Sequence, residues 1–387
     1  MDTKPAVGLD IGGRSVKYTV LTPTGGKYQA TGSIIPSRYM ELELEQILRG
    51  IVSRIPEDVS CFGVLTSYPI SCTTYRQGVE RLVTLFKDIL PATPVFFIDF
   101  EGRMWPLEDV MSTDPARFAM SNFLGSVFLG SKICSTCVVM DTGSTSTDIL
   151  RIADNRPVTI GRDTGDIRRT LTGEMTWTGI IATPISSLAQ FVPLRGQLVK
   201  GNPRGGTAND VYNVLSYEKM GEILRTYGMN QKRKEEYSLD IASLFLCDLE
   251  NIEPAEVENV AHYVSVKHVE TVAGFLLQVL SFHKLKAEDT DFVLMGIGKD
   301  LLLKKVLTLL DVEKSRIFDV ADYVPGDFWA HGSSLGAALR TLDHVTGENI
   351  PLSDIRVNSN ECNLLEPNTR SLDLNLRHEK TRGETAD

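Results

Sequence analysis

Two aspartates stand directly before glycine-containing loops at matching places in the chain. Asp10 ends the apolar stretch VGLD, and Asp141 ends the stretch VVMD. When the sequence is shifted by 131 positions, Asp10 falls on Asp141 and Ser15 falls on Ser146. Apolar, alternating residues flank both loops, which predicts two strand–loop–strand units of the same design.

Both loops carry groups that bind anions. A glycine has no Cβ, so backbone N–H groups around it can approach an anion closely. Hydroxyl and basic side chains beside the glycines add further donors. The candidate anion-binding residues are Gly12, Gly13, Arg14, Ser15, Lys17, Thr142, Gly143, Ser144 and Thr145. Two facing loops suit an extended anion, such as a diphosphate or a nucleotide tail, better than a single phosphate.

The two aspartates predict a cation between their carboxylates. If the loops face each other, Asp10 and Asp141 face each other too, and carboxylates beside phosphate oxygens repel unless a cation separates them. Mg²⁺ accepts one or two carboxylates together with waters and phosphate oxygens. The alternative is that each aspartate only caps its own turn. The duplicated pattern favours an anion cleft with Mg²⁺ as the cofactor.

The elements that position these loops are expected to be hairpins. Neither loop shows G-x-x-x-x-G-K-[ST] or G-x-G-x-x-G, so neither is a P-loop or a Rossmann loop. Hydrophobic periodicity predicts helices and strands around both hairpins. The expected helices cover residues 41–54, 77–90, 116–128, 255–282, 301–310 and 329–345, and the expected strands cover 61–67, 95–100, 291–295 and 316–320.

Three stretches are expected to lack regular structure. The polar, glycine-rich stretches 162–184 and 195–210 are too long for ordinary connections and are expected to be functional or mobile loops. From about residue 351 the chain is polar, which predicts a disordered tail or a loosely wrapped extension. The expected division is a first half over 1–130, a second half over 131–350 and a tail over 351–387.

Composition limits the class of partner. The formal net charge is −10 and the chain has no basic block, which argues against a nucleic-acid surface or an anionic membrane surface. No apolar leader or membrane-spanning run is present, and six scattered cysteines suit a reducing cytoplasm. We expect a cytoplasmic protein with small-molecule partners and without nucleic-acid or membrane partners; the question of a homo-oligomer stays open.

Several stretches resemble a known superfamily. GLDIGGRSVK, VVMDTGSTSTDI and the turn LMGIG resemble the phosphate and adenosine motifs of the acetate kinase, sugar kinase, heat-shock chaperone and actin superfamily. LTGEMTWTGIIATPISSL, FVPLRG and TANDVYNVL are similar to its hydantoinase A/oxoprolinase branch, and within that branch to the family of methanofuran-biosynthesis synthases. The resemblance implies an α/β fold of two related ribonuclease H-like halves, of the actin and sugar kinase type, around a central cleft.

The same resemblance implies a reaction. A phenol on a glutamylated tyramine or tyrosine unit attacks the CH₂ of an aminomethylfuran methyl diphosphate, an ether forms and diphosphate leaves. This step belongs to methanofuran biosynthesis, in one-carbon metabolism that uses tetrahydromethanopterin. In this scheme Asp10 and Asp141 hold Mg²⁺, while Lys17 and the two loops hold the diphosphate.

The resemblance also suggests a base and a carboxylate-binding group. A phenol has a pKa near 10, so a base or a nearby cation must assist at neutral pH. Glu174 and Asp210, beside or within the two polar loops, are the expected candidates for that base, although composition alone favours two solvated carboxylates. The candidates for binding substrate carboxylates are Arg168, Arg169 and Arg195.

Two other classes of function fit the same loops. One is an ATP-dependent kinase or a hydantoinase/oxoprolinase-type amide hydrolase, and the other is a filament or chaperone-like switch. At the expected adenosine turn, Ile297 separates Gly296 from Gly298, whereas kinases of the superfamily usually have adjacent glycines there. This departure favours a small diphosphate over ATP. Asp148 stands where the first loop has Lys17, so the two halves differ chemically.

Overall fold

The first sheet is built around β1, which is buried along its whole length. A computed structural model of the 387-residue chain describes residues 4–12, 15–36, 41–160, 166–227, 229–324 and 326–357. The strands are β1 (Ala6–Ile11), β2 (Ser15–Thr24), β3 (Lys27–Pro36), β4 (Cys61–Thr66), β5 (Val95–Ile98), β6 (Met104–Pro106) and β15 (Ile355–Val357). Their order is β15-β3-β2-β1-β4-β5-β6, with β1–β2–β3 antiparallel and β1–β4–β5 parallel. β1 and β4 read as continuous apolar runs because both of their faces are covered.

The second sheet repeats this arrangement. Its strands are β7 (Cys137–Thr142), β8 (Thr147–Ala153), β9 (Arg156–Pro157), β10 (Met175–Thr176), β13 (Phe292–Met295) and β14 (Ile317–Asp319). Their order is β10-β8-β7-β13-β14, and β9 pairs with β8. The hairpin β7–β8 and the strand β10 are antiparallel, whereas β7–β13–β14 are parallel. Both sheets therefore have the ribonuclease H-like strand order, which confirms the expected α/β fold of two related halves.

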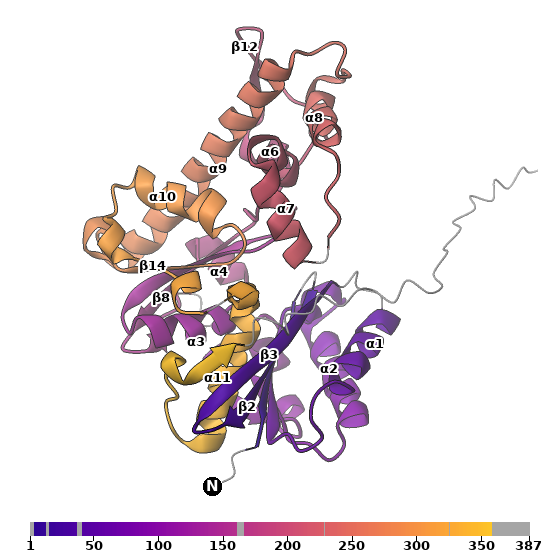
Figure 1. The fold of residues 1–387 in the computed structure, drawn as a ribbon, viewed down its shortest axis with the longest axis vertical. Helices are drawn as coiled ribbons and strands as arrows, with labels where there is room; N and C mark the ends of the chain where they lie inside the picture. Colours follow the sequence, from indigo (N-terminus) through magenta and orange to yellow (C-terminus); the bar gives the residue numbers. More distant parts are fainter. Residues whose placement is uncertain are drawn as a thin grey trace, which may run out of the picture.

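Helices cover both faces of the first sheet. Helices α1 (Glu41–Val52) and α2 (Tyr75–Ile89) pack on one face, where Leu44 and Val79 meet Val7. Helix α11 (Gly332–Thr346) packs on the other face, helix α3 (Leu124–Ile133) packs on the second sheet, and the two helices pack on each other in a core that also contains Val139. The two halves thus share α3 and α11 as a common layer (Figure 1).

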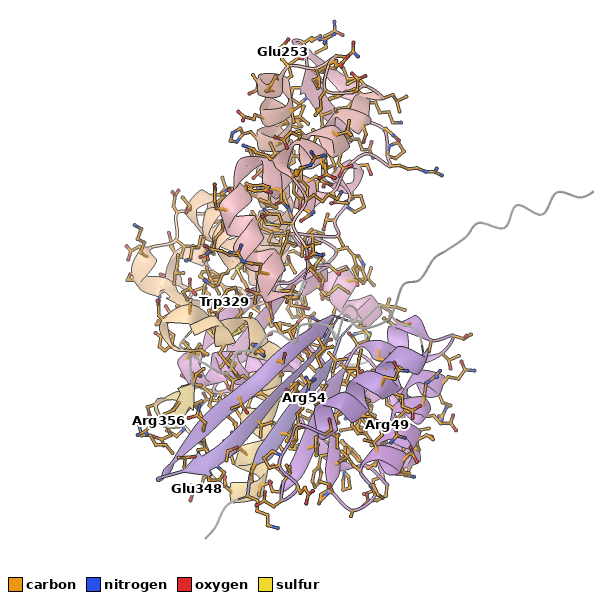
Figure 2. All side chains as sticks on the ribbon, turned by 45° about the vertical axis from the view of Figure 1, so that its right-hand side comes forward. Arg49, Arg54, Glu253, Trp329, Glu348 and Arg356 are labelled. Atoms are coloured by element: carbon orange, nitrogen blue, oxygen red, sulfur yellow. The ribbon has the colours of Figure 1, made fainter. Side chains whose placement is uncertain are left out.

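A helical insertion separates β10 from β13. It contains α5 (Ile185–Leu188), β11 (Phe191–Leu194), β12 (Gln197–Lys200), α6 (Ala208–Leu215), α7 (Tyr217–Thr226), α8 (Lys234–Ala242) and α9 (Pro254–Phe282). One end of α9 packs on the second sheet and the other end packs on α6 and α8. Glu253, just before α9, marks the far end of the insertion in Figure 2. Within the described ranges, no helix is long and apolar enough to cross a membrane.

Short helices complete the fold. The remaining segments are η1 (Tyr68–Ser71), η2 (Val110–Ser112), η3 (Pro115–Arg117), α4 (Asp166–Thr172), η4 (Ser243–Phe245), η5 (Ala287–Asp289), η6 (Lys299–Leu303), α10 (Lys304–Leu309), η7 (Lys314–Arg316), η8 (Val320–Asp322), η9 (Gly326–His331) and η10 (Leu352–Asp354). The expected helix over 116–128 is wrong, because the N–H of Ser121 donates to Thr66 O of β4 and α3 starts only at Leu124.

Other expectations also need correction. The stretch 162–184 is not one long loop, since its described part contains α4 and β10. The stretch 195–210 contains β12 and the start of α6. Residues 355–357 are not a disordered tail, because they form β15 beside β3; residues 358–387 lie outside the described residues. Helix α11 falls within the expected second half and packs on β1 and β4 of the first sheet.

Candidate functional site

The two hairpins place their charged residues at equivalent positions. In β1–β2, Asp10 lies opposite Lys17; in β7–β8, Asp141 lies opposite Asp148. All four residues line one cavity of about 320 Å³. The cavity also takes in Ser15, Ser144 and Thr145, so the two loops that are far apart in sequence do meet at one site.

Helices α3 and α11 hold the two aspartates. The Oγ of Ser126 in α3 donates a hydrogen bond to Oδ2 of Asp141, and the Oγ of Ser333 in α11 donates one to Oδ2 of Asp10. The two helices cross where Gly125 meets Gly336, so closely that a Cβ on Gly336 would lie 1.9 Å from the carbonyl oxygen of Gly125. This close crossing brings the two serines to the two aspartates from one helix layer.

Lys17 supplies the positive charge of the site. Its Nζ lies 3.5 Å from Oδ2 of Asp10 and donates to Oγ of Ser333 at 3.3 Å. Burial alone would lower the pKa of Lys17, but Tyr227, Asp10 and Asp141 raise it above its ordinary value. The two carboxylates are sufficient cause for this direction, and Lys17 therefore stays charged at neutral pH.

The two carboxylates fit a magnesium ion. Oδ1 of Asp10 is buried and has no hydrogen-bond partner among the residues that the structure describes, which is costly unless a ligand pairs with it. Burial raises the pKa of Asp141, although Ser126 and Lys17 oppose this shift. Within the described ranges, no three His, Cys, Asp or Glu residues cluster as a metal site. A Mg²⁺ ion held by two carboxylates, with waters and phosphate oxygens as its other ligands, is compatible with this donor set.

The second loop leaves three consecutive backbone N–H groups without a protein acceptor among the described residues. The carbonyl oxygens of Gly143, Ser144 and Thr145 accept hydrogen bonds from the backbone N–H groups of residues 179–182. The N–H groups of residues 144–146 have no protein acceptor in the described part of the chain, and all three residues line the cavity. Consecutive N–H groups of this kind bind anions.

Two glycines lie closely against the second loop and against Asp141. At Gly179, a Cβ would lie 2.3 Å from the amide nitrogen of Thr145, so only glycine lets residues 179–182 brace the second loop. Gly296 has φ +77° and lines the cavity, and a Cβ there would lie 2.2 Å from Oδ1 of Asp141. Gly298 packs against Thr142 and Ile180 and does not line the cavity.

The role of the first glycines needs correction. The N–H of Gly12 donates to Ser15 O at 3.0 Å, and the N–H of Gly143 donates to Ser146 O at 2.9 Å. These two N–H groups close their own turns and do not face an anion. Gly13 and Arg14 lie outside the described residues. Thr142 is also internal, since its hydroxyl pairs with that of Thr147 at 3.0 Å.

Neither expected base lies at the cavity. Glu174 is fully buried: its Oε1 accepts from the N–H of Ile160 at 2.7 Å, and its Oε2 accepts from the Thr172 hydroxyl at 3.0 Å. Asp210 belongs to the N-terminal capping box of α6, where its Oδ2 accepts from the N–H and hydroxyl of Thr207. Both carboxylates stabilise local structure, and the expectation that one of them is the base is not supported.

One of the three expected arginines lies at the cavity. Arg169 is buried, pairs with Asp148 and places its guanidinium 3.8 Å from the ring centroid of Phe123. Arg195 lies in the β11–β12 turn and donates to Asn251 O at 2.9 Å. Arg168 is in α4 and does not line the cavity.

Sequence reasoning missed several residues of the site. Ser126 and Ser333 lie on α3 and α11, Tyr227 directly follows α7, and no local pattern marks these residues. The apolar residues of the cavity lining were missed for the same reason. They include Ile70, Met120, Phe123, Met175, Trp177 and Trp329. Figure 2 shows Trp329 where the upper part of the molecule meets the first sheet.

Known proteins resemble this chain in sequence and fold. A model of the hydantoinase/oxoprolinase family matches residues 71–320. A protein of Methanocaldococcus jannaschii, named (4-{4-[2-(gamma-L-glutamylamino)ethyl]phenoxymethyl}furan-2-yl)methanamine synthase, is 26% identical over 193 residues, which are 50% of this chain and 56% of that protein. A protein of the same name from Methanococcus vannielii is 22% identical over 195 residues, which are 50% of this chain and 83% of that protein. The matched part thus spans little more than half of the first relative.

One solved structure shares the fold over most of the chain. The nucleotide-free structure of acetone carboxylase, an enzyme of ATP-dependent acetone carboxylation, has a TM-score of 0.52 and 12% identity. The likeness covers 86% of this chain and 70% of that one. At this identity the likeness concerns the fold alone.

Proposed function

Because the chain belongs to the hydantoinase/oxoprolinase family, we propose that it is a transferase that joins an aminomethylfuran methyl diphosphate to a phenol oxygen. The phenol belongs to a glutamylated tyramine or tyrosine unit, the product is an aryl ether and diphosphate leaves. The two relatives named as synthases of such a phenoxymethylfuran support this direction. The reaction would serve the biosynthesis of a methanofuran-type carrier for one-carbon units.

One observation carries the proposal: the cavity lining combines groups that can hold an anion with apolar side chains. Lys17 and the N–H groups of residues 144–146 belong to the first set, and Asp10 would hold Mg²⁺ beside them. Met120, Phe123 and Trp177 belong to the second set. A small aromatic ring that bears a diphosphate likewise has an apolar part and an anionic part.

The residues present suggest how the reaction is assisted. Mg²⁺, when held by Asp10 and Asp141, would neutralise charge on the diphosphate. The Lys17 ammonium and the N–H groups of residues 144–146 stabilise the charge that gathers on the leaving diphosphate.

The bonds and protons balance without a separate catalytic base. The phenol oxygen forms a bond to the CH₂ carbon as the bond from that carbon to the diphosphate oxygen breaks. The phenol proton passes to the departing diphosphate, whose oxygens are basic enough to accept it. This route needs neither Glu174 nor Asp210, which the structure places away from the cavity.

The test is direct product formation. The protein is incubated with Mg²⁺, aminomethylfuran methyl diphosphate and γ-glutamyltyramine, and the ether and released diphosphate are measured by mass spectrometry and a phosphate assay. Both should appear in equal amounts, and Lys17→Met should strongly reduce both. If no ether forms, and ATP stabilises the protein against heat while diphosphate does not, the transferase proposal fails. An ATP-dependent kinase or amide hydrolase would then be the better candidate.

A further inference from the structure

Tyr227 brings the helical insertion into the anion site. It directly follows α7, lines the cavity and is 9% exposed. Lys17 of the first hairpin lines the same cavity, close enough for the phenol and the ammonium to influence each other's pKa. Neither glycine loop contains this residue, so the insertion contributes a polar group of its own to the site.

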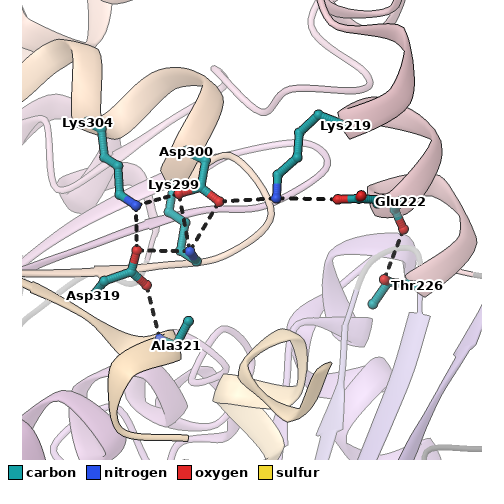
Figure 3. Close-up of polar contacts among 8 residues, drawn as sticks. All are labelled: Lys219, Glu222, Thr226, Lys299, Asp300, Lys304, Asp319 and Ala321. Atoms are coloured by element: carbon teal, nitrogen blue, oxygen red, sulfur yellow. Dashed lines mark hydrogen bonds and ion pairs between the residues drawn. The ribbon is translucent and has the colours of Figure 1, made fainter. Parts of the chain in front are cut away.

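Helix α7 is fixed at its other end. Nζ of Lys219 lies 3.6 Å from Oδ2 of Asp300, and Asp300 in turn contacts Lys299 and Lys304 (Figure 3). Lys299 is buried and also pairs with Asp319 at 2.9 Å. Helix α7 therefore runs from a charged cluster of the second half to Lys17 of the first half.

The hydroxyl of Tyr227 keeps one hydrogen-bond donor available for a ligand. An ammonium group only donates hydrogen bonds, whereas a phenol both donates and accepts. Toward the Lys17 ammonium the phenol oxygen can therefore only accept, which leaves the O–H proton for another partner. No acceptor for this proton is found among the described residues, and the phenol belongs to the cavity wall.

We propose that Tyr227 is a ligand-binding residue whose O–H donates to an oxygen of the bound diphosphate. The inference deepens the proposed function, on which it rests for the identity of the ligand. Lys17 orients the phenol, and α7 carries it to the cavity. The diphosphate is then held from three sides: the second loop, the first hairpin and the helical insertion.

The test compares two tyrosines of the same region by calorimetric titration of inorganic diphosphate in the presence of Mg²⁺. Tyr227→Phe removes only the hydroxyl and should weaken Kd about tenfold or more, the usual effect of losing a hydrogen bond to a charged group. Tyr217→Phe makes the same change at the start of α7, where the hydroxyl donates to Lys232 O at 2.7 Å outside the cavity, and should weaken Kd far less than Tyr227→Phe does.

A second variant tests the anchoring of α7. Lys219→Met removes the ion pair with Asp300 outside the cavity and should weaken diphosphate binding by a smaller factor. A wild-type Kd in Tyr227→Phe would overturn the inference, and so would a wild-type protein that binds no diphosphate. If diphosphate binds in a Tyr227-dependent way but no ether is formed, the proposed function fails and the inference stands.

Discussion

The crossing of α3 and α11 offers a sharp test of how the site is built. Replacing Gly336 by alanine adds one methyl group, whose carbon would lie 1.9 Å from Gly125 O and 2.7 Å from Gly125 C. Real Cβ atoms essentially never come within 3.0 Å of such neighbours. The obstacle is backbone and cannot rotate away, so the helices would have to separate by about 1 Å in a closely packed layer.

The expected cost follows from two opposing effects. In a helix interior, alanine is favoured over glycine by about 1 kcal/mol. Overpacking a core costs about 1–3 kcal/mol, occasionally more, and a clash between two backbones belongs at the upper end. We therefore expect Gly336→Ala to lower the free energy of unfolding by about 2 kcal/mol. Since Ser126 and Ser333 lie on these helices, diphosphate affinity should fall as well.

Urea denaturation followed by circular dichroism measures the change in the free energy of unfolding. Gly274→Ala is a matched control, because Gly274 is also within a helix, α9, and a Cβ there meets nothing within 4 Å. The control should raise the urea midpoint, as helix propensity predicts, whereas Gly336→Ala should lower it. If both variants shift the midpoint in the same direction, the close crossing of the two helices is not what fixes the site.

Three further predictions concern the site and its support. Lys17→Met should weaken the binding of inorganic diphosphate at least about tenfold in a calorimetric titration, because it removes a charged donor; unchanged binding would exclude Lys17 from the anion site. Gly179→Ala should displace the second loop at Thr145 and also weaken diphosphate binding, and a wild-type Kd would show that residues 179–182 do not brace the loop. His268 is buried and bonded to Thr178 O, and burial lowers its pKa from 6.5 to about 4. In this range the unfolded histidine binds a proton that the folded one does not, so stability should fall as pH drops from 6.5 to 4, by at most about 1.4 kcal/mol per pH unit. Urea midpoints across this range should change less in His268→Gln, and equal slopes in both proteins would contradict the assignment.

The sequence by itself determined the two hairpins and much of their surroundings. Apolar runs mark β1, β4 and β7, and alternation of apolar and polar residues marks β2, because each pattern is set by neighbours along the strand. The repeat of Asp10 at Asp141 also indicated that two loops share one design. The long helix α9 was expected over 255–282 and is observed at Pro254–Phe282, since its apolar face repeats with helical spacing.

Tertiary structure decided which side chains reach the cavity. Glu174 and Asp210 have the right chemistry for a base, yet their hydrogen bonds to Ile160 and Thr207 hold them away from the cavity. Ser333 reaches Asp10 across 323 positions, through a helix crossing that only glycine allows. Periodicity reports the face on which a residue lies, but contacts between distant segments depend on how the elements pack. For this reason the sequence indicated the two glycine loops, and the fold determined the groups that surround them.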